Sequence, residues 1–278
     1  MLSVARAEAH SLEGISRAAA SSIHGLAVAQ ELRLARLVDF AAPKPTFDRS
    51  LIAQATALVK TFERPQVLRR LLASIDRMCP RLHVVVVDDS RQPLQSPRVT
   101  TVALAYDTGV AAGRNEGLKH VMTPYVVVLD DDLVFFRGTR LDRALELMER
   151  YPEIDIVGGQ VIDLPLVRRR QPPRGAIFAT DAIPVRPIGS SIGGREVVDK
   201  VPNFFVARRD RLELVQWDPL LKRMEHADFF TRALGTLTTV FDPSVRCFHA
   251  RTPFDASYMA KRLELGEDSR ILTERYGA

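Results

Sequence analysis

The chain has 278 residues, 46% of them hydrophobic and 26% charged, which suits one large or two small globular domains and argues against disorder. Its formal charge of +5 comes without a stripe of basic and aromatic side chains, so we expect no nucleic-acid partner. No apolar run reaches the roughly 18 residues of a membrane span. Glu8, His10 and Glu13 interrupt any N-terminal signal sequence, and the sequence therefore predicts a cytoplasmic protein.

The cysteines and the densest basic run refine this expectation. Cys79 and Cys247 cannot form a disulfide framework, and we predict that both are reduced and structural. The basic run, residues 168–170, precedes two prolines and predicts a solvated loop. An anionic donor, acceptor or lipid surface is the alternative partner for the positive charge, which leaves peripheral contact with the inner face of a membrane open.

Residues 1–50 differ in composition from the rest of the chain. Apolar side chains between Ile23 and Leu37 follow a helical spacing loosely, and a break follows between Ala41 and Pro45. We therefore predict a helical appendage and linker over residues 1–50 and one α/β domain over residues 51–278. Packing on that domain, binding to a partner and contact with a membrane surface are all open for the appendage.

From Ala55 onward, short apolar runs alternate with helical patterns. The predicted strands are 55–60, 83–87, 99–105, 125–129, 154–162, 201–207, 237–241 and 245–248, and the predicted helices begin at Pro65, Gly113, Leu141 and Asp228. Continuous apolar strands separated by helices are typical of a mostly parallel central sheet with helices on both faces. Residues 164–200, rich in proline and glycine, predict a long irregular insertion that could form binding loops.

Three adjacent carboxylates, Asp130, Asp131 and Asp132, follow the apolar strand 125–129. Their mutual repulsion and desolvation are costly unless a cation compensates, and a hard divalent ion with oxygen ligands does so. If the strand continues through the triplet, Asp130 and Asp132 point to one side and Asp131 points away. The pattern favours Asp130 and Asp132 as a metal-binding pair, with a helix-capping loop as the structural alternative.

Further polar residues end neighbouring strands, and ligands bind at the carboxyl ends of strands in such sheets. Asp88 and Asp89 follow one predicted strand, where capping of the loop is the alternative to binding a base or ribose. A glycine-punctuated turn, residues 109–117, leads into a helix and offers backbone N–H groups and Arg114 to a diphosphate. These residues are therefore candidates for a nucleotide site.

Two more candidates come from the last third of the chain. Glu225 and Asp228 precede an apolar helix, where a general base is the functional interpretation and an N-cap the structural one. His249 follows the last predicted strand, where a histidine is more often structural than a ligand.

In this order, the elements resemble glycosyltransferases of the GT-A fold, particularly the family-2-like group. The residues that carry the resemblance are 56–64, 84–90, 113–117 and 128–132. Within that fold, the chain is similar to the β-1,4-N-acetylgalactosaminyltransferases related to ganglioside GM2 synthase, on residues 158–159, 201–208, 217–221 and 226–230. The resemblance covers most of the predicted α/β domain.

The resemblance implies a role for each candidate. Asp89 would contact the uracil, with Thr61 and Arg64 lining the nucleotide pocket and Arg114 near the nucleotide or its diphosphate. Asp130 and Asp132 would form the DXD pair that touches the ribose and holds Mn²⁺ or Mg²⁺, with His249 as a further metal ligand. Asp228 would be the catalytic base. Relatives usually carry Glu at that position, so this side chain is one methylene shorter, which leaves Glu225 as a competitor.

The implied reaction is inverting transfer of a sugar, GalNAc by resemblance, from a UDP-sugar to a hydroxyl of a glycan or glycolipid acceptor. UDP-GlcNAc, UDP-Gal and UDP-Glc remain open as donors. A sugar nucleotidyltransferase is disfavoured because residues 61–65 contain no glycine-rich phosphate loop. A non-catalytic sugar-nucleotide-binding module is disfavoured by the intact acidic triplet and Asp228. The sequence determines neither the acceptor nor the oligomeric state.

Overall fold

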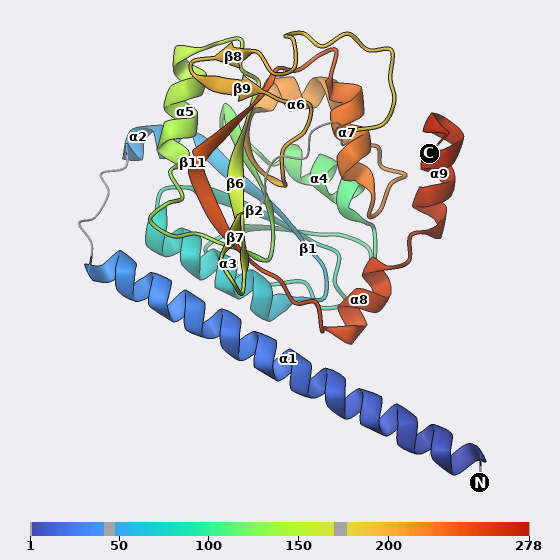
Figure 1. Cartoon of the computed structure of the whole chain (residues 1–278). Helices are drawn as coiled ribbons and strands as arrows, with labels where there is room; N and C mark the ends of the chain where they lie inside the picture. Colours follow the sequence, from blue (N-terminus) through green and yellow to red (C-terminus); the bar gives the residue numbers. More distant parts are fainter. Residues whose placement is uncertain (1, 42–47, 170–176, 278) are drawn as a thin grey trace.

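The computed structural model describes residues 2–41, 48–169 and 177–277, with side chains from residue 19 onward. A central twisted sheet has helices on both sides, and a long N-terminal helix runs beside the domain and projects beyond it (Figure 1). In the described part of the chain, no helix has the length and apolar character needed to cross a bilayer. The predicted linker after residue 41 lies almost entirely outside the described residues, as do Arg170 and the following six residues of the predicted insertion.

The helices and strands follow each other in this order: α1 (Leu2–Ala41), α2 (Arg49–Ile52), β1 (Ala55–Thr61), α3 (Pro65–Met78), β2 (His83–Asp88), β3 (Thr100–Ala103), α4 (Val110–Leu118), β4 (Tyr125–Asp130), β5 (Leu133–Val134), α5 (Leu141–Arg150), β6 (Ile156–Leu164), β7 (Arg168–Arg169), β8 (Ser191–Ile192), β9 (Arg195–Val197), β10 (Phe204–Arg208), α6 (Arg209–Val215), α7 (Glu225–Ala233), β11 (Thr239–Ala250), α8 (Ala256–Arg262) and α9 (Gly266–Tyr276).

The main path of the sheet has the order β3-β2-β1-β4-β10-β6-β11-β9-β8. Parallel pairs join β3, β2, β1 and β4 on one side and β6 and β11 on the other. Strand β10 lies between these groups and is antiparallel to both of its neighbours. The predicted sheet, mostly parallel in its core, is therefore confirmed, with one antiparallel strand at its centre.

The apolar strands are buried on both faces because helices cover each side of the sheet. Alternate residues of a strand face opposite sides, so each strand contributes to two cores. One core joins Ala57, Val59, Val127 and Leu129 to Leu68 and Leu71 of α3 and Leu141 and Leu145 of α5. The other joins Leu58, Val126 and Val128 to Ala111 of α4, Leu212 of α6 and Phe229 of α7.

The structure corrects several predicted boundaries. The predicted strands 237–241 and 245–248 are one strand, β11, whose register against β6 shifts between Asp242 and Arg246. Within this bulge, the side chain of Asp242 accepts the backbone N–H of Ser244 at 2.8 Å, which satisfies a donor that the ladder leaves unpaired. Helices α2, α6, α8 and α9 were not predicted, since three have seven residues or fewer and α9 is polar over most of its surface.

Both cysteines lie in the apolar core that contains α3 and α5. Cys79 and Cys247 are buried and form no disulfide. Burial raises the pKa of the Cys79 thiol to about 12, which keeps it protonated and unreactive at neutral pH. The prediction of two reduced structural cysteines is confirmed.

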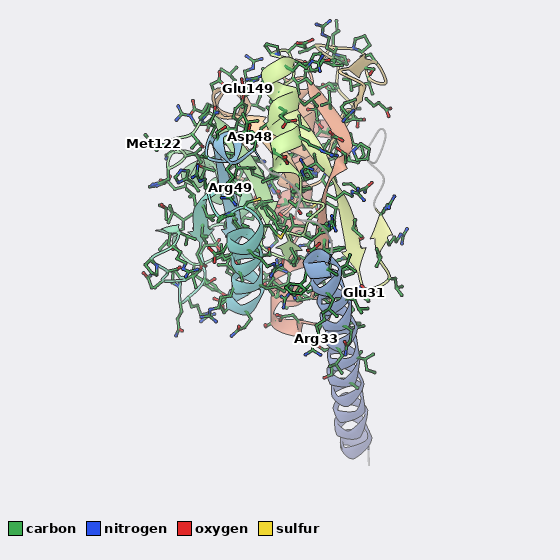
Figure 2. All side chains as sticks on the ribbon, turned by 90° about the vertical axis from the view of Figure 1, so that its left-hand side faces the viewer. Glu31, Arg33, Asp48, Arg49, Met122 and Glu149 are labelled. Carbon is green, nitrogen blue, oxygen red and sulfur yellow. The ribbon has the colours of Figure 1, made fainter. Side chains whose placement is uncertain are left out.

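Helix α1 packs on the domain through part of its length (Figures 1 and 2). Val28 and Leu32 form a small core with three residues of the domain, Val134, Leu164 and Ala250. Ile52 of α2, by contrast, belongs to the core of the sheet. We therefore propose that α1 is the predicted appendage and that the sheet domain begins with α2.

Candidate active site

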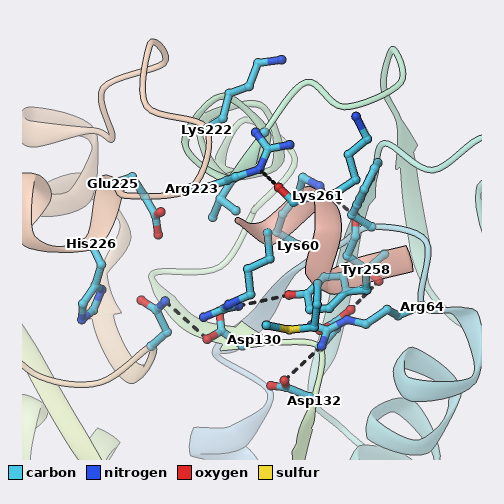
Figure 3. Close-up of a pocket in the computed structure, with 18 of the residues that line it drawn as sticks. Lys60, Arg64, Asp130, Asp132, Lys222, Arg223, Glu225, His226, Tyr258 and Lys261 are labelled. Atoms are coloured by element: carbon cyan, nitrogen blue, oxygen red, sulfur yellow. Dashed lines mark hydrogen bonds and ion pairs between the residues drawn. The ribbon is translucent and has the colours of Figure 1, made fainter. Parts of the chain in front are cut away.

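A pocket of about 520 Å³ opens at the carboxyl ends of β1 and β4 (Figure 3). The pairing of Thr61 with Asp88 and of Lys60 with Asp130 brings the ends of β1, β2 and β4 level with one another. Six of the predicted site residues line this pocket: Thr61, Arg64, Asp89, Asp130, Asp132 and His249. Arg114 and Asp228 are not among its lining residues. Sites for small ligands have volumes of roughly 300–1,000 Å³, so a nucleotide-sized ligand fits here.

The three aspartates of the acidic triplet all line the pocket. Strand β4 ends at Asp130, and Asp131 and Asp132 form a turn. The expectation that Asp131 points away is therefore wrong, because the strand alternation on which it rests stops one residue earlier. Asp131 is only 1% exposed, and one of its oxygens accepts a hydrogen bond of 2.7 Å from the Thr61 hydroxyl.

Arg64 holds two carboxylates of the triplet. Its guanidinium forms an ion pair with Asp131 and lies 3.2 Å from Asp132 Oδ2. The same group stacks on the ring of Tyr258, 3.8 Å from the ring centroid, which fixes its plane (Figure 3). Arg64 thus supports the acidic turn from the pocket wall and compensates the cost of burying its carboxylates.

Asp132 and His249 form the part of the pocket that fits a divalent cation. Asp132 Oδ1 is buried and receives no hydrogen bond of good geometry from the described residues, although His249 Nε2 lies 3.1 Å away. Two neighbouring ligands, each about 2.1 Å from an octahedral ion, would be separated by about 3 Å, so this spacing fits. His249 Nδ1 lies 2.6 Å from Asp163 Oδ1, a carboxylate–histidine arrangement that orients metal-binding imidazoles.

The described residues contain no group of three or more His, Cys, Asp and Glu side chains arranged to enclose a metal ion. A Mg²⁺-like ion that bridges to a diphosphate uses only one or two protein carboxylates, with phosphate oxygens and water as the other ligands. Burial disfavours the charge of Asp132, but hydrogen bonds and the charges of His249 and Arg64 hold its pKa below the ordinary value. The pair Asp132–His249 therefore fits an ion that is shared with a substrate.

Asp89 lines the pocket but has two partners in the protein. One oxygen is paired with the Lys60 ammonium, and the other accepts the backbone N–H of Gly109 at 2.9 Å. Gly109 has a φ of 103°, and a Cβ there would lie 2.8 Å from Lys222 Cα, so only glycine suits this turn. Burial lowers the pKa of Lys60, an effect that Asp89 opposes. Asp89 thereby ties β1, β2 and the start of α4 together at the pocket.

Arg114 is only 1% exposed and is not among the lining residues of the pocket. It donates hydrogen bonds to Asp130 Oδ1 at 3.0 Å and to Glu225 Oε1 at 2.7 Å. In this structure, two nitrogens of the guanidinium are occupied by carboxylates that line the pocket, and the placement of Arg114 near the nucleotide or its diphosphate stays a prediction. Burial raises the pKa of Glu225, and the negative charge of Asp130 raises it further. The positive charge of Arg114 lowers the pKa but does not cancel these effects.

Asp228 lies outside the pocket and is fully buried. Its carboxylate accepts hydrogen bonds from Arg232 at 2.8 Å, Arg275 at 2.5 Å and the Tyr276 hydroxyl at 2.8 Å. These contacts join α7 to α9, the C-terminal helix. Glu225, one helical turn earlier, lines the pocket instead, facing it from the side opposite Arg64 and Tyr258 (Figure 3).

Six basic and aromatic residues of the pocket were not predicted from the sequence: Lys60, Lys222, Arg223, Tyr258, Lys261 and Arg262. Lys60 could have been found, because a lysine that closes an apolar strand is rarely buried without a carboxylate partner. Tyr258, Lys261 and Arg262 belong to α8, a seven-residue helix too short for a recognisable pattern. The lysines and arginines of this set line the same pocket as the acidic triplet, and their positive charges suit an anionic ligand such as a diphosphate.

Comparison with known proteins identifies the family and the fold of the chain. Residues 56–215 match the family described as glycosyl transferase family 2. The β-1,4 N-acetylgalactosaminyltransferase 1 of Homo sapiens is 35% identical over 210 residues, which cover 68% of this chain and 37% of that protein. The β-1,4 N-acetylgalactosaminyltransferase 2 of Mus musculus is 33% identical over 223 residues, which cover 75% of this chain and 42% of that protein. The chain thus spans about two fifths of the length of these relatives.

Solved structures show the same fold at low sequence identity. S. aureus TarS 1-349 in complex with UDP has a TM-score of 0.54 and 19% identity, over 70% of this chain and 59% of that chain. GalNAc-T7 with UDP, GalNAc and Mn²⁺ has a TM-score of 0.54 and 15% identity, over 70% of this chain and 43% of that chain. The predicted GT-A fold is confirmed.

Proposed function

Since this chain belongs to glycosyl transferase family 2, we propose that it transfers a sugar from a UDP-sugar to a hydroxyl of a glycan or glycolipid acceptor with inversion at the anomeric carbon. The observation that carries the proposal is the pair Asp132–His249, supported by Asp163 and placed beside Asp130 in a pocket with a basic rim. We take UDP-GalNAc as the donor, because the curated relatives are named for that sugar.

Asp132 and His249 would hold Mn²⁺ or Mg²⁺, with the more exposed Asp130 facing the ribose and the same ion. A bound ion would supply a Lewis acid that stabilises the negative charge of the leaving diphosphate. The chain's own cations on the rim, Lys261 and Arg262 among them, would attract the diphosphate and reduce its repulsion from the triplet. This proposal requires the metal for turnover.

Glu225 is the better candidate for the base that takes the proton of the acceptor hydroxyl. It lines the pocket, and burial raises its pKa, which brings the carboxylate closer to the working pH of a general base. Arg114 fixes its orientation through one oxygen. Asp228 has neither property, because it lies outside the pocket with both oxygens bonded to α7 and α9 side chains.

The test is release of UDP from UDP-GalNAc, UDP-GlcNAc, UDP-Gal and UDP-Glc, each with Mn²⁺ and with EDTA, in the presence of glycan and glycolipid acceptors. We expect turnover that EDTA abolishes and that is fastest with UDP-GalNAc, and a product whose anomeric configuration is inverted by NMR. A requirement for a nucleoside triphosphate, or binding of UDP-sugar without turnover under any condition, would contradict the proposal.

A further inference from the structure

Helix α1 exposes an apolar stripe on the side that faces away from the domain. Five large side chains, each 60–68% exposed, form the stripe: Ile23, Leu26, Leu34, Leu37 and Val38. Spacings of three, four and eight residues place them on one face of a helix. Val28 and Leu32, on the opposite face, pack against the domain. Within the stripe the exposed Gln30 separates Leu26 from Leu34. Five large apolar side chains exposed on one helix face are still unusual on a protein that meets only water.

The charged residues of α1 are sorted in the same way. The two carboxylates among its described side chains face the domain, where Glu31 accepts the N–H of Leu166 at 2.8 Å and Asp39 accepts the N–H of Arg137 at 3.3 Å. Arg33 and Arg36 are exposed and form no ion pair with a described carboxylate. Figure 2 shows Glu31 and Arg33 on different sides of α1. The edge of the stripe that borders the groove beside α1 therefore carries arginines, and Glu31 lies toward the other edge.

A groove of about 480 Å³ between α1 and the domain extends this positive surface. Four arginines line it, Arg33, Arg36, Arg70 and Arg251, against a single carboxylate, Asp255. That carboxylate already caps α8 by accepting the N–H of Tyr258 at 3.1 Å. The Arg70 Nε atom is buried and has no described hydrogen-bond partner, so an anionic group entering the groove would meet an unsatisfied donor.

We propose that the stripe and the arginines beside it dock this chain on the surface of an anionic lipid membrane. Apolar side chains would enter the boundary between headgroups and acyl chains while the arginines bind lipid phosphates, as in helices that lie in a membrane interface. A second copy of α1 is the less suitable occupant, because paired helices carry flanking charges of both signs and the edge of the stripe that borders the groove has arginines only. The proposal does not depend on sugar transfer.

The groove and the donor pocket share Arg251 and Thr252 as lining residues. Docking through α1 would therefore bring the wall of the pocket that contains Arg251 and Thr252 to the side of the domain next to the membrane.

The test is flotation of the 278-residue chain with vesicles of phosphatidylcholine alone or with roughly 30 mol% phosphatidylglycerol. The buffer contains about 0.15 M salt, at which the Debye length is about 8 Å. We expect binding to the anionic vesicles only, weakened by higher salt. Replacing Arg33 and Arg36 together with Gln should lower the partition coefficient about thirtyfold, since each arginine near a charged surface contributes a factor of about five.

Leu26→Ser with Leu37→Ser should abolish binding, and matched variants elsewhere should not. Leu214→Ser with Leu220→Ser removes two leucines of similar exposure, 62% and 64%, from other surfaces. Arg143→Gln with Arg150→Gln removes two exposed arginines of α5. Absence of vesicle binding by the unmodified chain would overturn the proposal. So would a dimer, measured by light scattering, that Leu26→Ser with Leu37→Ser converts to a monomer while neither form binds vesicles.

Discussion

The Arg275 guanidinium on α9 lies 2.5 Å from Asp228 Oδ1 on α7, although 47 positions separate the two residues in the sequence. Asp228 is fully buried, so this contact compensates a charge that would otherwise be costly in the interior. The C-terminal helix is thereby attached to the helix that carries Glu225 into the pocket.

Asp228 is expected to act on stability more than on chemistry. Arg275→Ala should lower the free energy of unfolding by about 1–3 kcal/mol, because the buried acceptor loses one of its partners. Asp228→Asn should destabilise by a similar amount and keep most of the UDP release per folded molecule. Urea denaturation, together with turnover measured well below the unfolding midpoint, separates the two effects. A catalytic role for Asp228 would instead leave stability unchanged and remove turnover with UDP binding intact.

Glu225 is expected to control the chemical step. Glu225→Gln preserves the size of the side chain and a hydrogen-bond acceptor for Arg114 but removes the basic group, so we expect kcat to fall by about 10²–10⁴-fold with little change in KM for the donor. Arg114→Lys tests whether the orientation of Glu225 matters, since a lysine cannot donate to Asp130 and Glu225 from two separate nitrogens as the guanidinium does. An unaffected kcat for Glu225→Gln would exclude it as the base.

Metal binding is expected to depend on Asp163, which lies behind His249. Asp163→Asn should weaken the apparent affinity for Mn²⁺ by about 10–100-fold, because the imidazole loses the carboxylate that orients it. Titration of UDP release with Mn²⁺ measures this affinity, and isothermal calorimetry with Mn²⁺ and UDP gives a readout independent of turnover. The matched control is Asp199→Asn, a carboxylate outside the pocket lining, whose loss should leave the titration unchanged.

Acid should destabilise the protein in part through His226. Burial, with the nearby charges of Arg114 and Lys200, lowers the pKa of His226 to about 3 from the model-peptide value of 6.5. Below about pH 6.5, His226 therefore binds a proton in the unfolded chain but stays neutral in the folded chain. The free energy of unfolding falls as the pH decreases, down to about pH 3. The slope for one such group approaches about 1.4 kcal/mol per pH unit below pH 6.5, which amounts to about 2 kcal/mol between pH 7 and pH 5.

The check is chemical denaturation of the unmodified chain and of His226→Gln at pH 5, 6 and 7. We expect a shallower pH dependence for the variant, because its side chain does not titrate. His120→Gln, on a surface where the side chain is 43% exposed, serves as the control. Parallel pH profiles for His226→Gln and the unmodified chain would show that His226 does not contribute.

Helix α4 packs so closely on the sheet that a methyl group should not be tolerated. A Cβ at Gly117 would lie 2.4 Å from Leu58 Cδ1 and 2.5 Å from Val87 Cγ2, so Gly117→Ala should destabilise by about 1–3 kcal/mol. Gly25→Ala on α1 is the matched control, since a Cβ there meets nothing within 4 Å and alanine favours helix by about 1 kcal/mol. Thermal denaturation of both variants should therefore give shifts of opposite sign.

The sequence alone determined the α/β class, the order of the central strands and helices and the location of the acidic turn. These features depend on local patterns: β-branched runs such as residues 84–87 are buried on both faces of a sheet, and strand ends lie at one edge. The rule that strand ends meet at one edge of the sheet predicted that Thr61, Asp89 and the acidic triplet lie close together, and all of them line one pocket.

Only the tertiary structure decided which of the candidates face that pocket. Strand alternation cannot predict the direction of the Asp131 side chain, because β4 ends at Asp130. That direction depends on the contacts of Asp131 with Thr61 and Arg64. Arg114 and Asp228 are placed by partners distant in sequence, Glu225 for the first and Arg275 for the second. A carboxylate at the start of a helix looks the same in sequence whether it faces a ligand or an arginine of another helix, because long-range pairing of charges leaves no local pattern.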